Sequence, residues 1–405
     1  ACAAGFAQVG GNPQALYFRT TDGASWAPGG FQGYGGAVGF VDASRGFLVN
    51  IFGKAFRSED GGQSWVEIPE AGLGAGTMMD GDFPAEIAVS HDGQTVWIVG
   101  QGGNCSYSND GGATWTKTVV TPPGTDTSLN AAAIAGDSIW IAGGRPSAPT
   151  EVDPITEEEI PGHPASSGFV LRSDDGGQSF QTVTSGLGYS VNAIDFVNLD
   201  EGWLAGGTHE EGGATLARTS DGGATWTPSA PPDFPEGEVY VEMGASVVPG
   251  TCYEIDFFGR QVGVAYCTTS TWEFDGANGL YLTTDGGAAW TFQPGLREAM
   301  PGGNMAQMAL VNSAIFDMAF PDCHHGWLVG AGKLIARWDN DDASMDCEAG
   351  GAPSDEGAPD DGGEDGDGDG DGGGDGGGGR EDSCGCRAAG ARSASPLGAL
   401  LALLS

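Results

Sequence analysis

The sequence predicts an all-β fold, a seven-bladed β-propeller, from three observations. One short motif recurs along most of the chain, an apolar strand precedes each copy, and the units are about 50 residues long. The 405 residues include 74 glycines and 11 tryptophans, a composition that suits short strands joined by tight turns and packed through aromatic side chains. Rings of six or eight blades are the alternatives.

The recurring motif is a turn of the form Ser/Thr-x-Asp-Gly-Gly-x-x-Trp/Phe. Five full copies and one copy a residue shorter begin at Ser58, Ser108, Ser173, Thr219, Thr283 and Thr20, the last being the shorter. An aspartate in such a turn accepts hydrogen bonds from backbone N–H groups that follow it, and glycine supplies positive φ. We therefore predict a structural role for the aspartates and aromatic residues of the motif: Asp22, Asp60, Asp110, Asp175, Asp221, Asp285, Trp26, Trp65, Trp115, Phe180, Trp226 and Trp290.

Two apolar strands precede the motif in most units. One is often entered by Gly-Trp or Gly-Phe, as in 202–206, and an alternating strand such as 193–197 comes before it in six of seven units. Each unit therefore consists of strand A, a short turn, strand B, strand C, the motif as the C–D turn, and strand D. The two ends differ, because the first unit has no visible strand A and residues 337–342 of the last lack Gly-Gly and the motif aromatic.

At these residues the chain resembles the Asp-box propellers, also called bacterial neuraminidase repeat propellers. The Phe/Asp strand, the Gly-Trp strand and the Asp-Gly-Gly-x-Thr-Trp box resemble most the photosystem II stability and assembly factor-like branch. The resemblance covers residues 5 to about 340 and implies the propeller fold, which hosts many activities. Plant and cyanobacterial members assist photosystem assembly, and nothing else in the sequence points to photosynthesis.

The long insertions indicate which face of the propeller binds a ligand. In a four-stranded blade the A–B turn and the box share one face, and the B–C and D–A connections share the other. Five insertions belong to the second face, at 66–84, 116–128, 144–168, 228–250 and 291–312. Long loops are commonly functional, and these are rich in methionine and aromatic side chains that suit an adaptable interface. The candidate binding residues are Met78, Met79, Asp80, Phe83, Phe234, Tyr240, Arg297, Met300 and Met305.

A sialidase and another carboxylate-dependent glycosidase are the alternatives to this binding role. A sialidase needs three arginines for its substrate carboxylate. Outside the repeated position before each box, residues 1–347 contain only Arg45, Arg145, Arg260 and Arg297, and Arg45 and Arg260 are in A–B turns on the face opposite the insertions. A glycosidase needs two carboxylates at a defined separation, and the sequence does not single out such a pair. The strand-A acids Asp195, Asp256 and Asp317 recur in one phase, which the repeat explains better than a catalytic role does. We predict no catalytic residue, and a secreted glycoside hydrolase stays the alternative.

No metal or cofactor is expected. The five histidines form no metal-ligand spacing with one another or with cysteine, and no P-loop, dinucleotide fingerprint or Gly-x-Ser-x-Gly sequence is present. The segment beginning Asp365-Gly-Asp-Gly-Asp resembles the start of a calcium loop, but Gly376 stands where the twelfth ligand would be a glutamate.

The charge excludes a nucleic-acid binder. The formal net charge is −40, and the chain has only 15 basic residues against 55 acidic ones, whereas phosphate neutralisation requires a basic surface. Residues 1–347 hold 42 acidic and 12 basic residues, and residues 348–383 hold 13 and one. We expect a soluble, self-repelling exterior and a monomer.

Eight cysteines favour an oxidising, exported setting. Antiparallel pairing of strands A and B in the sixth unit places Cys252 opposite Cys267, which predicts a cross-strand disulfide. Cys323 and Cys347 are predicted to connect the last A–B turn to the chain that leaves the ring.

The chain after the propeller changes character, so we divide it into a propeller at 1–347, a linker at 348–383 and a terminal segment at 384–405. The linker is rich in Asp and Gly and should be disordered. Cys384-Gly-Cys386-Arg387 and the apolar end resemble the C-terminal sorting tail of myxobacterial-type surface proteins. That resemblance implies export, display at the cell surface and contact with a membrane only through the tail. The sequence thus predicts an exported, non-catalytic propeller that binds a protein or glycan through its insertion-bearing face.

Overall fold

The protein is all-β, as predicted. The computed structural model describes residues 2–9, 12–19, 27–28, 35–42, 44–50, 52–73, 84–90, 92–123, 127–145, 151–152, 159–160, 167–208, 213–233, 249–268, 278–293, 315–330 and 334–339. Every regular element in these ranges is a β-strand, and neighbouring strands pair antiparallel. The fold class is therefore confirmed, while the number of blades in the ring stays a prediction.

The described strands form successive sheets of three or four strands, which we number blades 1–7 in chain order. Blade 1 consists of β1 (Cys2–Val9), β2 (Asn12–Arg19) and β3 (Ala27–Pro28). In the later blades the first strand is β4 (Gly35–Phe40), β8 (Pro84–Val89), β12 (Ser128–Ala135), β18 (Ser190–Phe196), β22 (Thr251–Phe257) or β26 (Ile315–Asp322). The second strand is β5 (Gly46–Asn50), β9 (Val96–Gly100), β13 (Ser138–Gly144), β19 (Gly202–Gly207), β23 (Gly263–Thr268) or β27 (His325–Gly330).

Each later blade continues outward in the same way. The third strand is β6 (Ala55–Ser58), β10 (Asn104–Ser108), β16 (Gly168–Ser173), β20 (Ala214–Thr219), β24 (Asn278–Thr283) or β28 (Leu334–Asp339). The outer strand is β7 (Val66–Glu67), β11 (Thr116–Val119), β17 (Gln181–Leu187), β21 (Thr227–Ser229) or β25 (Thr291–Gln293), and the described residues of blade 7 include none. A small hairpin of β14 (Glu151–Val152) and β15 (Glu159–Ile160) lies within the connection from β13 to β16.

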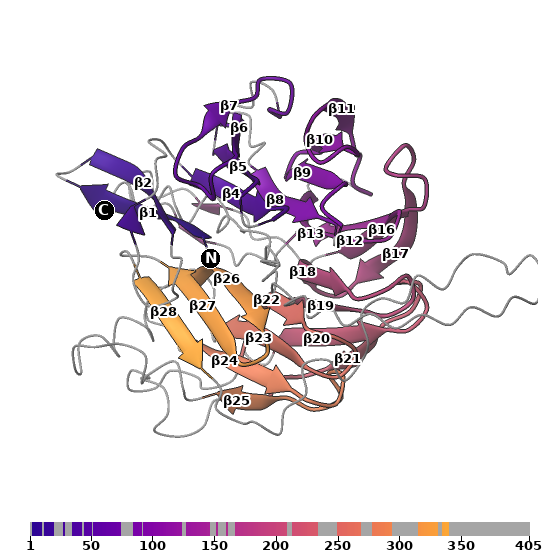
Figure 1. Cartoon of the computed structure of the whole chain (residues 1–405). Helices are drawn as coiled ribbons and strands as arrows, with labels where there is room; N and C mark the ends of the chain where they lie inside the picture. Colours follow the sequence, from indigo (N-terminus) through magenta and orange to yellow (C-terminus); the bar gives the residue numbers. More distant parts are fainter. Residues whose placement is uncertain are drawn as a thin grey trace, which may run out of the picture.

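The blades are arranged as a ring with their first strands innermost (Figure 1). Successive first strands contact one another from β4 through β8, β12, β18 and β22 to β26, and β1 contacts β4 on one side and β26 and β27 on the other. The first and last described blades are therefore neighbours, as a closed propeller requires. Blades 5 and 6 are further joined by pairing of Gly207 with Thr251.

All six first strands of blades 2–7 contain a β-bulge at the same place. The register against the second strand shifts by one residue near the start of each first strand, as between Leu129 and Ala131 or between Val191 and Ala193. A bulge increases the local twist of a strand. Its repetition is expected to add the same local twist to each inner strand.

Aromatic packing joins each blade to the next. Trp140 of blade 4 stacks on Phe196 of blade 5 with ring centroids 3.8 Å apart, and Trp203 of blade 5 stacks on Phe257 of blade 6 at 3.6 Å. Both tryptophans are fully buried. Stacked pairs of this kind add to the free energy gained from burial, so the predicted role of one large aromatic residue per unit holds at these interfaces.

The second glycine of the box lies against the aromatic side chain that the preceding blade inserts. A Cβ on Gly177 would lie 1.9 Å from Cζ2 of Trp97, and a Cβ on Gly112 would lie 2.0 Å from the ring of Phe47. Positive φ angles of 88° and 85° at these glycines close the box turn at the same time. Glycine is therefore required twice over, by the turn and by the side chain that the preceding blade inserts.

Candidate functional site

The Asp-box turns share one hydrogen-bond pattern in blades 2–6. In blade 2, Ser58 Oγ donates to Asp60 Oδ1 (2.9 Å), and the Gly62 backbone N–H donates to Ser58 Oγ (2.7 Å). The Ser64 backbone N–H and hydroxyl donate to the two oxygens of the Asp60 carboxylate at 2.9 and 2.6 Å. Equivalent bonds surround Asp110, Asp175 and Asp221, and around Asp285 the hydroxyl bond is missing because Ala289 has no hydroxyl group.

These bonds favour the ionised carboxylates. The side-chain hydroxyl of Ser64, Thr114 or Ser179 is the main cause, and it lowers the pKa of Asp60, Asp110 and Asp175 to about 2. A general acid at neutral pH needs the opposite shift. The box aspartates are therefore turn residues, in agreement with the role expected of them.

Box aromatics lie where the ring packing needs them. Trp115 is edge-on to Phe47, Phe180 to Trp97, Trp226 to Phe196, and Trp290 to Phe257. Trp65 packs against Phe40. The contacts of Trp65, Trp226 and Trp290 are thus within their own blades, whereas Trp115 and Phe180 contact the preceding blade. Asp22 and Trp26, the motif residues of blade 1, lie outside the described residues.

The arginines before the boxes are held by intramolecular contacts. The Arg172 guanidinium lies over the Trp140 ring at 4.9 Å and pairs with Asp174 at 2.7 Å. Arg218 lies over Trp203 at 5.7 Å and shares Glu201 with Arg260, the two N···O distances being 3.0 and 2.6 Å. Because these charges are already paired, this part of the box face offers no free arginine cluster for a substrate carboxylate.

Polar side chains on the inner strands connect neighbouring blades. Asp195 Oδ2 accepts the Phe257 backbone N–H at 2.8 Å, and Glu86 Oε2 accepts the backbone N–H of Ala132. The Asn130 amide donates to Val191 O at 2.9 Å. Sequence reasoning missed Glu86 and Asn130, for which the signal is one polar residue at or just after the bulge of an otherwise apolar strand.

The register places the strand-A acids along their strands. Asp195 lies opposite Trp203, and Asp256 opposite the equivalent Val264. Asp317 instead lies opposite Val329, two residues beyond Trp327, and is thus equivalent to Glu254, which faces Tyr266. The three acids thus share one phase of the alternating strand, but Asp317 stands two residues further from its A–B turn, nine residues before Gly326 instead of the seven between Asp195 and Gly202.

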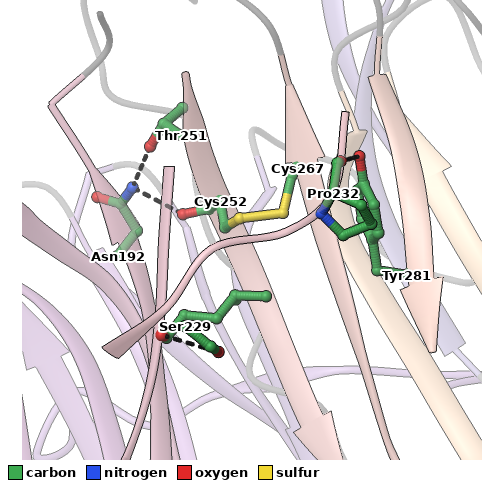
Figure 2. The surroundings of a disulfide bond; sticks show 8 residues. Asn192, Ser229, Pro232, Thr251, Cys252, Cys267 and Tyr281 are labelled. Atoms are coloured by element: carbon green, nitrogen blue, oxygen red, sulfur yellow. Dashed lines mark hydrogen bonds between the residues drawn. A yellow bond between two sulfur atoms is a disulfide. The ribbon is translucent and has the colours of Figure 1, made fainter. Parts of the chain in front are cut away.

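The predicted disulfide between Cys252 and Cys267 is present, and both residues are buried. It joins opposite residues of β22 and β23. Figure 2 shows the Asn192 amide beside it, donating to Thr251 Oγ1 (3.2 Å) and to Cys252 O (3.0 Å). Covalent and hydrogen-bonded connections thus meet on the inner strand of blade 6.

The candidate binding face itself lies outside the described residues. This applies to every residue proposed for it: Met78, Met79, Asp80, Phe83, Phe234, Tyr240, Arg297, Met300 and Met305. Cys347 and the tail cysteines Cys384 and Cys386 are likewise outside them. Their roles stay predictions.

Neither a metal centre nor a membrane helix is seen in the described ranges. Those ranges contain no group of three or more His, Cys, Asp or Glu side chains placed to hold a metal ion. No helix in the same ranges is both long and apolar enough to cross a bilayer.

Acid should destabilise the fold through the box aspartates. Their pKa of about 2 in the folded state is below the value near 3.9 of an unfolded chain, so their stabilisation is complete above pH 4 and is lost as the pH falls through 2. Because water screens these exposed groups, we expect the melting temperature to fall by only about 5 °C between pH 5 and pH 2.5. Thermal unfolding followed by circular dichroism measures this fall.

A triple variant, Asp60→Asn, Asp110→Asn and Asp175→Asn, is the control for that prediction. Asparagine keeps one acceptor oxygen in each turn but does not titrate, so the variant should be less stable at pH 7 and lose less on acidification. An acid slope equal to that of the parent protein would contradict the role given to these carboxylates.

Comparison with known proteins gives two kinds of relative. The family described as photosynthesis system II assembly factor YCF48 matches residues 36–136, which begin in blade 2, include all of blade 3 and end after β12. A xyloglucanase from Paenibacillus sp. is 33% identical over 141 residues, covering 32% of this chain and 13% of the relative. The photosystem II assembly lipoprotein Ycf48 of Synechococcus sp. (strain CC9902) is 34% identical over 85 residues, covering 20% of this chain and 22% of the relative.

A solved structure of YCF48 bound to a D1 peptide is also similar, with a TM-score of 0.37 and 15% identity, covering 76% of this chain and 92% of that chain. The matched segments span about an eighth of the xyloglucanase and about a fifth of the assembly lipoprotein. Parts of this chain are therefore similar to a xyloglucanase and to a photosystem II assembly lipoprotein.

Proposed function

We propose that this protein is a non-catalytic propeller that binds a protein or glycan partner through its insertion-bearing face. This proposal rests on the difference in connection length between the two ends of the blades. At the box end the first and second strands are joined by short turns, from residue 40 to 46, 89 to 96, 135 to 138, 196 to 202 and 257 to 263. At the other end lie the connections from 67 to 84, 144 to 168, 229 to 251 and 293 to 315.

Side-chain chemistry at the box end supports this choice of face. The carboxylates of Asp110 and Asp175 are used in turns, and those of Asp174 and Glu201 in ion pairs with arginine. Groups held in this way stabilise the ring and are poorly placed to bind a partner. Long connections of the kind found at the opposite end are the usual setting of binding loops.

A protein is the favoured partner, because the family model that matches blades 2 and 3 describes an assembly factor. Methionine and aromatic side chains on the long connections suit an apolar, adaptable contact. A net charge of −40 favours a partner surface that is neutral or basic, since an acidic one would be repelled.

A glycoside hydrolase is the second candidate, favoured by the match to a xyloglucanase. Such an enzyme needs one carboxylic acid with a raised pKa and a second carboxylate at a fixed distance. In the described residues the aspartates with a resolved shift in pKa have it lowered, as for Asp110 and Asp175. These aspartates are therefore not suited to act as the general acid.

The test uses the purified full chain against a displayed peptide library, an array of glycans and soluble xyloglucan. We expect saturable binding to a peptide or glycan and no release of reducing sugar from xyloglucan. Replacing Met300, Met305 and Met308 by Ser should weaken binding at least tenfold at an unchanged melting temperature. Release of reducing sugar would favour the hydrolase instead.

Two exposed glutamines on the box face give the matched control. Gln63 and Gln178 each donate only to the carbonyl of their own box aspartate, so the double variant Gln63→Ala, Gln178→Ala should bind as the parent does. If this variant lost binding and the methionine variant kept it, the interface would lie on the box face, and the proposal would be wrong.

We also propose that the protein is exported and displayed at the cell surface. The Cys252–Cys267 disulfide supports an oxidising compartment, and Cys384-Gly-Cys386 resembles a sorting tail. Residues 348–383 would serve as the solvated spacer. Cell fractionation with protease treatment of intact cells tests this, and full-length protein found only in the cytosol would contradict it.

A further inference from the structure

The interface between blades 4 and 5 is closed by hydrogen bonds near the box. Trp140 stacks on Phe196 and donates its Nε1–H to Gly222 O at 2.9 Å. The Thr184 hydroxyl of the outer strand donates to Gly223 O at 2.6 Å. The outer side of blade 4 is therefore fixed to the box of blade 5 by two hydrogen bonds in addition to the stacked rings.

The interface between blades 5 and 6 repeats this arrangement. Trp203 stacks on Phe257 and donates to Gly286 O at 2.8 Å. The Ser229 hydroxyl donates to Gly287 O at 3.2 Å. A hydrogen bond holds its donor and acceptor within a narrow range of distance and angle. Blades 4, 5 and 6 therefore form one arc, in which each blade is fixed to the next at the box end.

The interface between blades 3 and 4 has side chains for both of these bonds but makes neither. Trp97 occupies the place of Trp140, and its fully buried Nε1 has no acceptor. Thr118 occupies the place of Ser229 in the outer strand. Its hydroxyl has no hydrogen-bond partner in the part of the chain that the structure describes. The box of blade 4 is thus not bonded to blade 3 in the way that the next two boxes are bonded to their neighbours.

This difference follows from the first two strands of blade 4. In blade 5, Phe196 lies opposite Gly202 and offers its ring to the indole of the preceding blade. The equivalent pair in blade 4 is Ile134 and Ile139, and isoleucine has no ring on which an indole can stack. The indole of blade 3 stacks instead on Tyr107 of its own blade, with ring centroids 4.8 Å apart.

The inner side of the same interface is bonded. The Leu129 backbone N–H donates to Gln101 O at 3.0 Å. The carboxylate of Glu86 accepts the backbone N–H of Ala132. Blades 3 and 4 are therefore held together by directed bonds along their inner strands, close to the ring axis.

The outer side of this interface is held by apolar packing. Trp97 lies edge-on to Phe180, with ring centroids 5.5 Å apart, and against Gly177 of the box. Apolar burial has no preferred direction, so the two blades can turn by a small angle while this contact stays buried. We propose that the interface between blades 3 and 4 is a hinge of the ring, fixed along the inner strands, and that blades 4–6 move about it as one rigid arc.

The hinge separates insertions of the proposed binding face. The insertion at 66–84 follows blade 2, on one side of the hinge, and the insertion at 228–250 follows blade 5, on the other side. A turn at the hinge changes the distance between the blades that carry these insertions, which adapts the face to the shape of a partner. This consequence rests on the proposed function, whereas the hinge itself is tested in the free protein.

Distances between equivalent box residues test the hinge. Ala113, Gln178, Ala224 and Ala288 are exposed and directly follow the second box glycine of blades 3–6. Replacing two of them at a time by p-acetylphenylalanine provides ketones for nitroxide labels and leaves the cysteines unlabelled. Double electron–electron resonance on the full chain then gives the distribution of distances between the labels.

Two label pairs are compared, and each spans two successive interfaces. The pair at 113 and 224 spans the hinge and the interface between blades 4 and 5, whereas the pair at 178 and 288 lies within the arc of blades 4–6. We expect the first distribution to be about twice as wide as the second. Equal widths would overturn the proposal, whether or not the protein binds a partner.

A reciprocal exchange of residue pairs tests the origin of the motion. Ile134→Phe with Ile139→Gly gives blade 4 the pair that blade 5 has, so the distribution for 113 and 224 should narrow to that of the other label pair. Phe196→Ile with Gly202→Ile should widen the distribution for 178 and 288. If the first double variant folds, as judged by circular dichroism, and its distribution stays wide, the role given to the missing stack is wrong.

Discussion

Replacing Trp203 by Ala is expected to destabilise the protein by about 3–5 kcal/mol, the cost of removing a large buried aromatic side chain. Trp203 is 1% exposed and stacks on Phe257 of the next blade. Its Nε1 donates to Gly286 O at 2.8 Å, and Arg218 lies over its ring. The substitution removes all three contacts and leaves a cavity between blades 5 and 6. Equilibrium unfolding in urea measures the loss.

Trp203→Phe separates the ring from the hydrogen bond. Phenylalanine retains an aromatic ring against Phe257 but leaves the Gly286 carbonyl without its donor, so we expect a smaller loss, about 1–2 kcal/mol. Equal losses in the two variants would mean that the hydrogen bond, rather than packing, holds the interface. A loss below about 1 kcal/mol for Trp203→Ala would contradict the role assigned to interblade stacking.

Replacing Gly177 by Ala is expected to have the second largest effect, a loss of about 3 kcal/mol or more. The added Cβ would lie 1.9 Å from Cζ2 of Trp97, and the residue has φ of 88°. Trp97 is fully buried and cannot move aside without disturbing its stack on Tyr107. Overpacking and left-handed strain therefore add.

Gly186 offers the matched control, because it has φ of 71° and nothing within 4 Å of an added Cβ. Gly186→Ala should cost only the backbone strain, about 1 kcal/mol. Melting temperatures of the two variants, measured side by side, give the difference that belongs to the Trp97 contact. Identical melting temperatures would show that the box glycine serves the turn alone.

The repeat explains why so much of the fold could be predicted from the sequence. Each box combines a hydroxyl, an aspartate and two glycines at fixed spacing, and this local chemistry specifies the turn wherever it occurs, as around Asp60 and Asp221. The disulfide between Cys252 and Cys267 was predictable for a related reason, because a short A–B turn fixes the register of the two strands that it joins.

Contacts between blades were harder to predict, because they depend on register around the ring rather than along the chain. Glu86 reaches a backbone N–H of β12, and Asn130 a carbonyl of β18. Each is one polar residue in an otherwise apolar strand. Asn130 recurs as Asn192, which makes the equivalent contacts with Thr251 and Cys252, but the bulge that directs these side chains at the next blade is not visible in the sequence. Asp317 stands nine residues before Gly326, whereas Asp195 and Asp256 stand seven residues before Gly202 and Gly263, so its place along the strand differs by two residues.

The direction of the tryptophan contacts has a consequence for unfolding. Trp140 Nε1 donates to Gly222 O, and Trp203 Nε1 to Gly286 O, so each indole completes the turn of the blade that follows and not of its own. A blade that opens therefore removes the packing partner of its successor, which couples nearest neighbours as in other repeat proteins. In a closed ring this coupling has no natural starting end, and we expect the blades to unfold together in one cooperative transition rather than one after another.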